Sequence, residues 1–262
     1  MERIFDDSKD LVLKYLSYEP YFNTYIFGDI DKFGLESNTV KIFVDNKQDI
    51  HCVLMEFLGD FVVYSYDNNF KVKSIAEYIE ASVDYENCCI SGKGSTVDVL
   101  SAYLQGKKLR KTFLAALENF EYAEYDKIYE SVVRLNDGNA KDLLELFCSI
   151  DEFKAKYKNY SEERMLRDMN NGRFFGIFGD DGKLVAAAAS TAESKICAMI
   201  TNVCTHPNHR RKGNAEQILC VLLKSMLDDG IKNICLYYDN PNAARLYNKL
   251  GFVEKGIYKT LR

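Results

Sequence analysis

The second half of the chain alternates between two hydrophobic periods, one typical of strands and one typical of helices. Short apolar runs predict strands, and two of them flank Gly179-Asp180-Asp181-Gly182, a sequence typical of a hairpin turn. Apolar residues three or four positions apart predict helices. The predicted strands are 131–135, 173–178, 184–192, 196–204, 233–238 and 252–260, and the predicted helices are 140–150, one beginning at Ser161, 213–229 and 242–250. Their order, β-α-α-β-β-β-α-β-α-β, predicts an α/β fold with a mixed sheet.

The first half shows the same two periods less regularly. Gly59-Asp60 separates two apolar runs, so these strands should form a hairpin. Gly92-Lys93-Gly94-Ser95 lacks the spacing of a nucleotide-binding phosphate loop, and we interpret it as a strand-to-helix turn. The predicted elements are a helix at 10–18, strands at 40–44, 51–57, 61–66 and 87–92, and a helix at 95–104.

Residues 118–126 are rich in Glu, Tyr and Phe without a clear period, which favours a domain boundary there. The chain has 262 residues, enough for two domains of ordinary size. The sequence therefore predicts an N-terminal domain at 1–122 and a C-terminal domain at 127–262.

Charge and hydropathy narrow the class of protein. The formal net charge of −5 argues weakly against a nucleic-acid surface, which normally has a basic excess. No apolar run approaches the ~18 residues of a membrane span, and the first residues lack the basic-then-apolar pattern of a signal peptide. We therefore expect a cytoplasmic protein with neither a membrane nor a nucleic acid as partner.

The eight cysteines include no CxxC pair, and most lie in apolar runs, which is typical of buried reduced thiols. Cys204, His206 and His209 are an alternative set of metal ligands. A fourth ligand is not evident, and tetrahedral sites need one or an open water position, so we predict no metal.

The segment from Ile200 to Ala215 carries the clearest chemistry. A predicted strand ends, a short polar loop follows, and Gly213 opens the longest helix. The first turn of a helix has unpaired N–H groups that, with the helix dipole, attract anions. Small residues leave this backbone accessible, and Arg210-Arg211-Lys212 adds positive charge. These residues alone predict a phosphate or pyrophosphate site, and the alternative is a basic loop that caps a core helix without a ligand.

Two segments resemble motifs of the GNAT family of N-acetyltransferases. Arg210-x-x-Gly213-x-Ala215 resembles the family's pyrophosphate signature, Gln/Arg-x-x-Gly-x-Gly/Ala, and Val203-Cys204-Thr205-His206-Pro207 resembles its Val-x-x-x-Pro lead-in. The segment from Asn240 to Phe252 resembles the family's Asn-x-x-Ala-x-x-Leu-Tyr-x-x-x-Gly-Phe at every named position. The resemblance covers about residues 127–262 and implies a GNAT acyl-coenzyme-A N-acyltransferase fold there.

The resemblance implies roles for the matching residues. Backbone amides of residues 211–215 would bind the pyrophosphate of acetyl-coenzyme A, and backbone groups near Val203 would bind the pantetheine arm and the acyl carbonyl, stabilising an oxyanion. Tyr247 would donate a proton to the departing thiolate, with a purely packed role as the alternative. The implied cofactor-binding residues are Asn202, Val203, Cys204, Arg210, Arg211, Lys212, Gly213, Asn214, Ala215 and Asn240.

The acceptor is expected to be a primary amine of a small molecule or peptide. A protonated amine is not a nucleophile, so a base or a water must take its proton. Glu193 is the candidate carboxylate, with a solvated turn residue as the alternative. Two different functions remain open for the whole protein: a GNAT fold that binds acyl-coenzyme A without catalysis, as a sensor, and a nucleotide-binding domain of another fold. A homodimer is also expected.

The chain departs from the family in two places. About ten residues follow Gly251-Phe252, where the family has two strands, so one strand is missing or supplied by the N-terminal half. The N-terminal half lacks a pyrophosphate motif and resembles the degenerate first half of tandem GNAT proteins of the FR47-like kind. The sequence therefore predicts two GNAT-like domains, of which the C-terminal one is catalytic.

Overall fold

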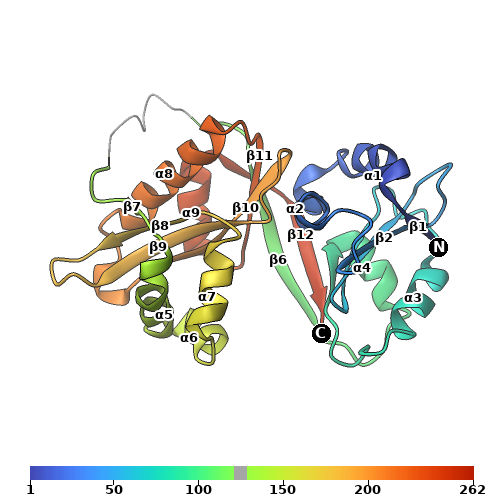
Figure 1. Ribbon diagram of the computed structural model, residues 1–262, viewed down its shortest axis with the longest axis horizontal. Helices are drawn as coiled ribbons and strands as arrows, with labels where there is room; N and C mark the ends of the chain where they lie inside the picture. Colours follow the sequence, from blue (N-terminus) through green and yellow to red (C-terminus); the bar gives the residue numbers. More distant parts are fainter. Residues whose placement is uncertain (121–128) are drawn as a thin grey trace. The chain divides into compact units, whose positions relative to one another are not determined.

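The computed structural model describes residues 1–120 and 129–262 (Figure 1). These residues form two compact units. Unit 1 comprises Met1–Ala116, Tyr237–Pro241 and Glu254–Arg262, and unit 2 comprises Leu117–Leu236 and Asn242–Val253. The chain therefore begins in unit 1, builds unit 2 and returns to unit 1 at its end. The boundary expected between residues 122 and 127 lies outside the described residues.

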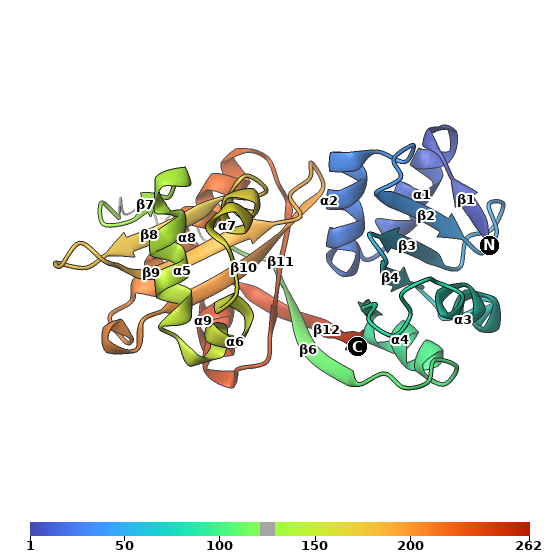
Figure 2. The ribbon, with the colours of Figure 1, turned by 60° about the horizontal axis from the view of Figure 1, so that its bottom comes forward.

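Unit 1 is a mixed sheet with helices on both faces (Figure 2). Its strands lie in the order β1-β2-β3-β4-β5-β12-β6, and β4 and β5 are parallel. Helices α1 and α2 cover one face, and α3 and α4 cover the other. Its elements are β1 (Glu2–Ile4), α1 (Lys9–Leu16), α2 (Thr24–Phe33), β2 (Val40–Val44), β3 (Val53–Phe57), β4 (Asp60–Tyr64), α3 (Val72–Glu80), β5 (Ile90–Lys93), α4 (Gly94–Ser101), β6 (Leu109–Leu117) and the end of β12 (Phe252–Leu261).

Alternation along the strands of unit 1 explains one of its cores. Phe61 and Val63 of β4 are buried with Ile75 and Ile79 of α3, because strand residues two apart share a face. The turn from β5 into α4 confirms that Gly92-Lys93-Gly94 is a strand-to-helix connection. A Cβ atom at Gly92 would lie 1.9 Å from the carbonyl oxygen of Val63, so only glycine permits this approach of β5 to β4.

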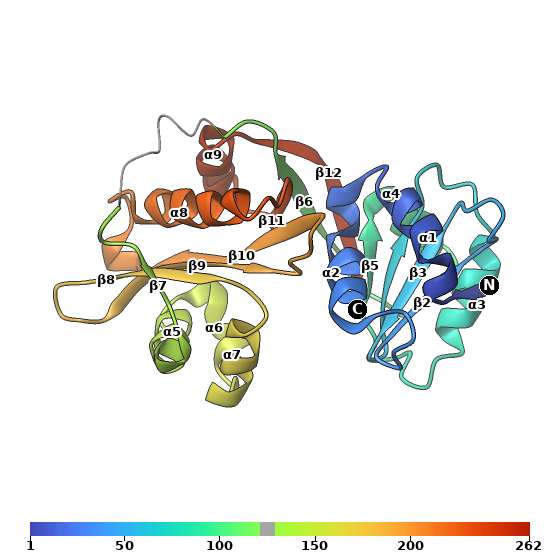
Figure 3. The same ribbon diagram turned by 45° about the horizontal axis from the view of Figure 1, so that its top comes forward.

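Unit 2 is also a mixed sheet with helices on both faces (Figure 3). Its strands lie in the order β11-β10-β9-β8-β7, with α5, α6 and α7 on one face and α8 and α9 on the other. Its elements are β7 (Val133–Arg134), α5 (Ala140–Cys148), α6 (Asp151–Tyr157), α7 (Glu162–Met169), β8 (Phe174–Phe178), β9 (Leu184–Thr191), β10 (Cys197–Thr205), α8 (Asn214–Asp228), β11 (Asn233–Tyr238), α9 (Pro241–Lys249) and the start of β12.

Local signals explain where the helices of unit 2 begin. The side chain of Asn136 accepts a hydrogen bond from the N–H of Gly138, which starts the short turn before α5. Ser161 accepts one from the N–H of Arg164 and caps α7. The predicted order of elements was wrong in one respect, since three helices rather than two separate β7 from β8. The helix missed is α6, whose seven residues are too few to show a helical period.

The last strand of the chain ends in unit 1. Residues Tyr258–Leu261 of β12 pair antiparallel with β5, with Tyr258 opposite Lys93 and Leu261 opposite Ile90. In the strand order, β12 lies between β5 and β6. The C-terminal end of the chain therefore supplies a strand to the sheet of unit 1.

Both units contain the same run of elements around a parallel strand pair. In unit 1 the run is β4-α3-β5-α4, and in unit 2 it is β10-α8-β11-α9. This repetition agrees with the predicted fold class of two α/β domains with mixed sheets. None of the described helices combines the length and the apolar character that crossing a bilayer requires.

Candidate active site

Strand β10 carries a bulge at the position where the sequence motif begins. Thr201 pairs with Ala189 and Cys204 pairs with Ala187, so β10 has one more residue than β9 between these pairs. Asn202, in the bulge, has a left-handed backbone with φ of 54°. Bulges turn backbone groups out of the ladder and occur often beside active sites. The bulge therefore frees backbone groups of residues 202–203 from the regular sheet.

The parallel pairing of β10 with β11 stops near this bulge. It runs from Cys197 opposite Asn233 to Ile200 opposite Leu236, whereas β10 continues to Thr205. The family resemblance implies that these two strands diverge, and a pairing that stops before β10 ends agrees with this expectation.

The loop after β10 leads into a helix start, where the first backbone N–H groups have no partner within the helix. Arg211 and Gly213 have left-handed φ angles of 63° and 82°, and Gly213 is the N-cap of the 15-residue helix α8. No side chain at the N-cap binds the first turn, because glycine has none. The nearest atom to a Cβ placed on Gly213 is Nε2 of Gln217 at 3.8 Å. This open first turn, with Asn214 and Ala215 as its first residues, fits a pyrophosphate.

The basic side chains of the loop differ in their contacts. Arg210 donates from Nε to the carbonyl oxygen of Thr205 at 3.1 Å and lies 3.4 Å from the carboxylate of Glu152, so it also holds the loop in place. Arg211 and Lys212 are exposed, and neither has an ion pair with any described residue. These two cations are therefore available to an anion at the start of α8.

Cys204 is buried, and burial raises the pKa of its thiol to about 12. Its thiol is therefore protonated at neutral pH and is not a reactive thiolate. In the part of the chain that the structure describes, no three His, Cys, Asp or Glu side chains gather as potential metal ligands. His206 instead accepts a hydrogen bond from the N–H of Asn208 and shapes the loop.

Tyr247 lies in α9 and is 6% exposed. Its ring packs against Phe252 with centroids 6.0 Å apart. Burial raises the pKa of its hydroxyl to about 12, so it remains a proton donor at physiological pH. Two residues later, Lys249 forms an ion pair of 2.7 Å with Glu216, which ties the end of α9 to the first turn of α8. Asn240 lies directly before α9.

Glu193 lies in the β9–β10 connection and is held by Arg173. Its carboxylate accepts hydrogen bonds from Nε of Arg173 at 3.2 Å and from Nη2 at 3.1 Å, and one from the hydroxyl of Ser190. Arg173 also binds Asp229 at 2.7 Å, just after the end of α8. The helix rises about 1.5 Å per residue and Asp229 follows Gly213 by 16 residues, so Asp229 is about 24 Å from Gly213 along α8. Residues 202–215 are consecutive in the chain and lie together at the start of α8. Glu193 lies instead near the C-terminal end of that helix.

Tyr157 is a residue that motif reasoning missed. It ends α6, is 1% exposed and stacks on Phe147 with ring centroids 4.4 Å apart. Its hydroxyl donates a hydrogen bond of 2.8 Å to Oδ1 of Asn202 in the bulge. The only sequence signal was an aromatic spacing at Phe153, Tyr157 and Tyr160, which does not reveal the partner.

Comparison with known proteins supports the interpretation of these elements. Residues 140–252 match the model of the acetyltransferase (GNAT) family. A GCN5-related N-acetyltransferase-like protein from Streptococcus suis is 16% identical over 99% of both chains, with a TM-score of 0.58. A GCN5-related N-acetyltransferase from Kribbella flavida is 18% identical, covering 90% of this chain and 95% of that one, with a TM-score of 0.59.

A Drosophila protein is 10% identical and has a TM-score of 0.74, covering 99% of this chain and 97% of that one. No curated protein matches the chain significantly. Identities this low show a shared fold, and that fold extends over nearly the whole chain. The matched region contains both the bulged strand β10 and the helix α8 that follows it. The chain therefore carries a domain of the acetyltransferase (GNAT) family at residues 140–252, as its two motifs predicted.

Proposed function

We propose that this protein transfers an acetyl group from acetyl-coenzyme A to a primary amine of a small molecule or peptide. The observation that carries the proposal is the succession of three features from Asn202 to Ala215. They are a bulged strand, a loop with two left-handed residues, and a helix start whose N-cap residue makes no side-chain hydrogen bond. This arrangement offers backbone donors to a carbonyl at one end and to a pyrophosphate at the other. Membership of an acetyltransferase family makes acyl transfer the reaction that fits best.

Bound acetyl-coenzyme A would supply the thioester, and the chain would position it and move protons. Amides of residues 211–215 would hold the pyrophosphate, with Arg211 and Lys212 adding charge, and Asn240 would contact the same cofactor. Backbone groups of Asn202, Val203 and Cys204 would hold the pantetheine arm and the acyl oxygen. Tyr247, neutral because its hydroxyl pKa is raised to about 12, would protonate the leaving thiolate.

The proton of the acceptor amine needs a separate route. Glu193 remains a proposed base, but its hydrogen bonds with Arg173 and Ser190 favour a structural role. Water at the divergence of β10 and β11 is then the better proton acceptor. A water can accept the proton of a primary amine, so the proposed acceptor does not depend on Glu193. The role of Glu193 is tested separately by substitution.

Substitution of Gly213 by glutamate tests the cofactor site. A carboxylate there would repel the pyrophosphate and strain a backbone with φ of 82°. We expect the affinity for acetyl-coenzyme A, measured by calorimetry, to fall on the order of a hundredfold or more, about 2.7 kcal/mol. Gly230→Glu is the matched control, since Gly230 follows the other end of α8 and has φ of 83°. Equal affinity in both variants would refute the site.

Thiol release with a panel of amines separates the enzyme from a non-catalytic sensor. The proposal predicts that at least one amine accelerates release of coenzyme A by the wild type and not by Gly213→Glu. Tight binding of acetyl-coenzyme A without amine-dependent release would instead support an acyl-coenzyme-A sensor.

A further inference from the structure

Unit 1 contains a pocket of about 330 Å³ that lies apart from the GNAT motifs. Its walls come from α1, from the loop between β2 and β3, and from the residues after β4. Three tyrosines, two lysines and a histidine line it: Tyr15, Tyr18, Tyr66, Lys14, Lys47 and His51. Pockets of about 300 Å³ and above can enclose small organic ligands.

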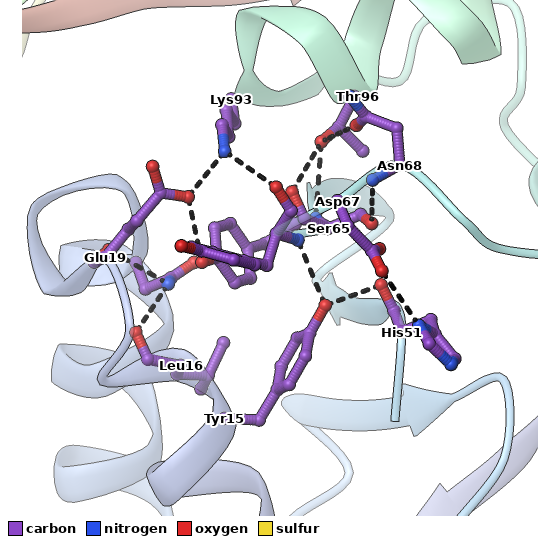
Figure 4. A network of polar contacts seen from close by, with 12 residues as sticks. Tyr15, Leu16, Glu19, His51, Ser65, Asp67, Asn68, Lys93 and Thr96 are labelled. Carbon is purple, nitrogen blue, oxygen red and sulfur yellow. Dashed lines mark hydrogen bonds and ion pairs between the residues drawn. The ribbon is translucent and has the colours of Figure 1, made fainter. Parts of the chain in front are cut away.

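The floor of this pocket is held by a network of hydrogen bonds (Figure 4). The hydroxyl of Tyr15 donates to the carbonyl oxygen of His51 at 2.6 Å and accepts from the N–H of Tyr66 at 3.0 Å. One side chain of α1 therefore joins both of the other walls. Its ring packs against Tyr64 with centroids 5.6 Å apart. The pocket is thus shaped before any ligand binds, which reduces the entropy lost on binding.

The two carboxylates at the pocket share one imidazole as their partner. His51 lies between Asp49 and Asp67, with its two ring nitrogens 3.1 Å and 3.2 Å from their oxygens. These carboxylates raise the pKa of the imidazole and favour its cationic form. In contrast, neither Lys14 nor Lys47 forms an ion pair with any described residue. Lys14 and Lys47 are thus the charged groups of the lining that keep no charged partner among the described residues, and the lysine, histidine and aspartate side chains of the lining sum to one positive charge when His51 is protonated.

Aromatic and apolar surface is exposed beside these lysines. Tyr18 is 60% exposed, Tyr66 is 54% exposed and Leu11 is 44% exposed. The rings of Tyr18 and Tyr66 are tilted, with centroids 5.5 Å apart. Large side chains exposed together at a pocket are typical of a binding surface. Tyrosine rings pack favourably with other planar rings, in offset-stacked or edge-to-face arrangements.

The pocket is distinct from the place that would correspond to a coenzyme site in unit 1. Beyond the parallel pair of β4 and β5, the hydroxyl of Thr96 lies 3.2 Å from the carbonyl oxygen of Ser65 and 3.0 Å from Oδ1 of Asn68. Lys93 binds Glu19 and donates to the carbonyl oxygen of Tyr66 at 3.1 Å (Figure 4). Side chains of unit 1 therefore bind one another beyond the end of its parallel strand pair, outside the pocket lining.

We propose that this pocket of unit 1 binds a small planar organic anion, an aromatic ring that carries a phosphate or carboxylate group. The ring packs against Tyr18 and Tyr66, and the anionic group pairs with Lys14 and Lys47. Unit 1 is then a ligand-binding unit, and its ligand differs from the coenzyme bound by unit 2.

Calorimetry on the full-length Gly213→Glu variant tests the proposal, because that substitution disables the proposed coenzyme site. AMP is the phosphate probe and salicylate the carboxylate probe, while adenosine lacks the charge and inorganic phosphate lacks the ring. We expect at least one anionic probe to bind saturably below about 10 mM. The probe lacking its charge or its ring should bind at least about fivefold more weakly.

Variants of exposed side chains locate the binding. Lys14→Ala with Lys47→Ala should weaken the affinity about five- to tenfold, and Tyr18→Ala about fivefold, without changing the melting temperature. Lys73→Ala is the matched control, since Lys73 is an exposed lysine of α3 outside the pocket. The proposal is overturned if neither probe saturates, if adenosine binds as well as AMP, or if the two lysine substitutions have no more effect than Lys73→Ala.

Discussion

The hydroxyl of Tyr157 donates a hydrogen bond of 2.8 Å to the side-chain oxygen of Asn202. This contact joins α6 on one face of unit 2 to the bulge in β10. Asn202 has φ of 54°, a conformation that costs an asparagine little but still needs support. Because Tyr157 is 1% exposed and stacked on Phe147, it cannot readily move away. We infer that Tyr157 positions the bulge whose backbone would hold the acyl group.

Replacement of Tyr157 by phenylalanine removes this hydrogen bond and keeps the ring. One neutral hydrogen bond contributes about 0.5–1.5 kcal/mol, so we expect kcat/KM for acetyl-coenzyme A to fall about three- to tenfold. Tyr160→Phe is the control, because the Tyr160 hydroxyl donates to Asp168 and not to β10. Asn202→Gly removes the same bond from the other side while keeping the left-handed backbone. If the bond acts through the bulge, the double variant is no slower than the slower single variant, and additive losses would contradict it.

Tyr247→Phe tests the proton donor. The substitution removes the hydroxyl and leaves the packing against Phe252, so turnover should fall about a hundredfold while the affinity for acetyl-coenzyme A changes little. Because the hydroxyl pKa is raised to about 12, the wild-type rate should show no loss from its ionisation between pH 7 and pH 10. Tyr78→Phe in unit 1 is the control for loss of a hydrogen-bonded tyrosine hydroxyl. An unchanged turnover would assign Tyr247 to packing alone.

Glu193→Gln separates a catalytic base from a structural anion. Its carboxylate and Arg173 are mostly buried together, with side chains 21% and 11% exposed. A structural role predicts a loss of about 1–2 kcal/mol in the free energy of unfolding, with turnover within about twofold of wild type. Asp229→Asn, which weakens the other ion pair of Arg173, should destabilise less, because the side chain of Asp229 is 65% exposed. A hundredfold loss of turnover at unchanged stability would make Glu193 the base.

The local pattern of apolar and polar residues predicted much of the fold. Strands β2 and β11 begin and end at the predicted residues, because each is rich in β-branched, aromatic or other apolar residues and polar residues flank it. Helix α2 was missed, since its sequence is rich in aromatic and β-branched residues and contains Gly28. Its burial of Ile26, Phe27 and Ile30 shows that packing overrides that propensity.

The sequence motifs predicted only part of the candidate site, because some of its contacts join segments that are distant in the chain. The motif predicted a helix start at Gly213, and the structure has Gly213 as the N-cap of α8. The hydrogen bond from Tyr157 to Asn202 joins residues that are 45 positions apart in the chain. The one from Arg173 to Glu193 joins the residue before β8 to the connection between β9 and β10. Contacts between distant segments depend on how helices pack on the sheet, which neither period nor spacing reveals. The pattern therefore identifies the residues proposed to bind the cofactor but not those that support them.

The C-terminal half should fold poorly when separated from residues 1–126. In the full chain, Tyr258 and Leu261 of β12 are 3% and 2% exposed and pair with β5. A fragment of residues 127–262 would expose these side chains and leave the strand without its partner, which favours aggregation. We expect a weak, non-cooperative thermal transition by circular dichroism and oligomers on size exclusion. A fragment of residues 127–253, which ends where unit 2 ends, should aggregate less because it lacks the unpaired strand. A cooperative melt of the 127–262 fragment at the temperature of the full chain would show that β5 contributes nothing to its stability.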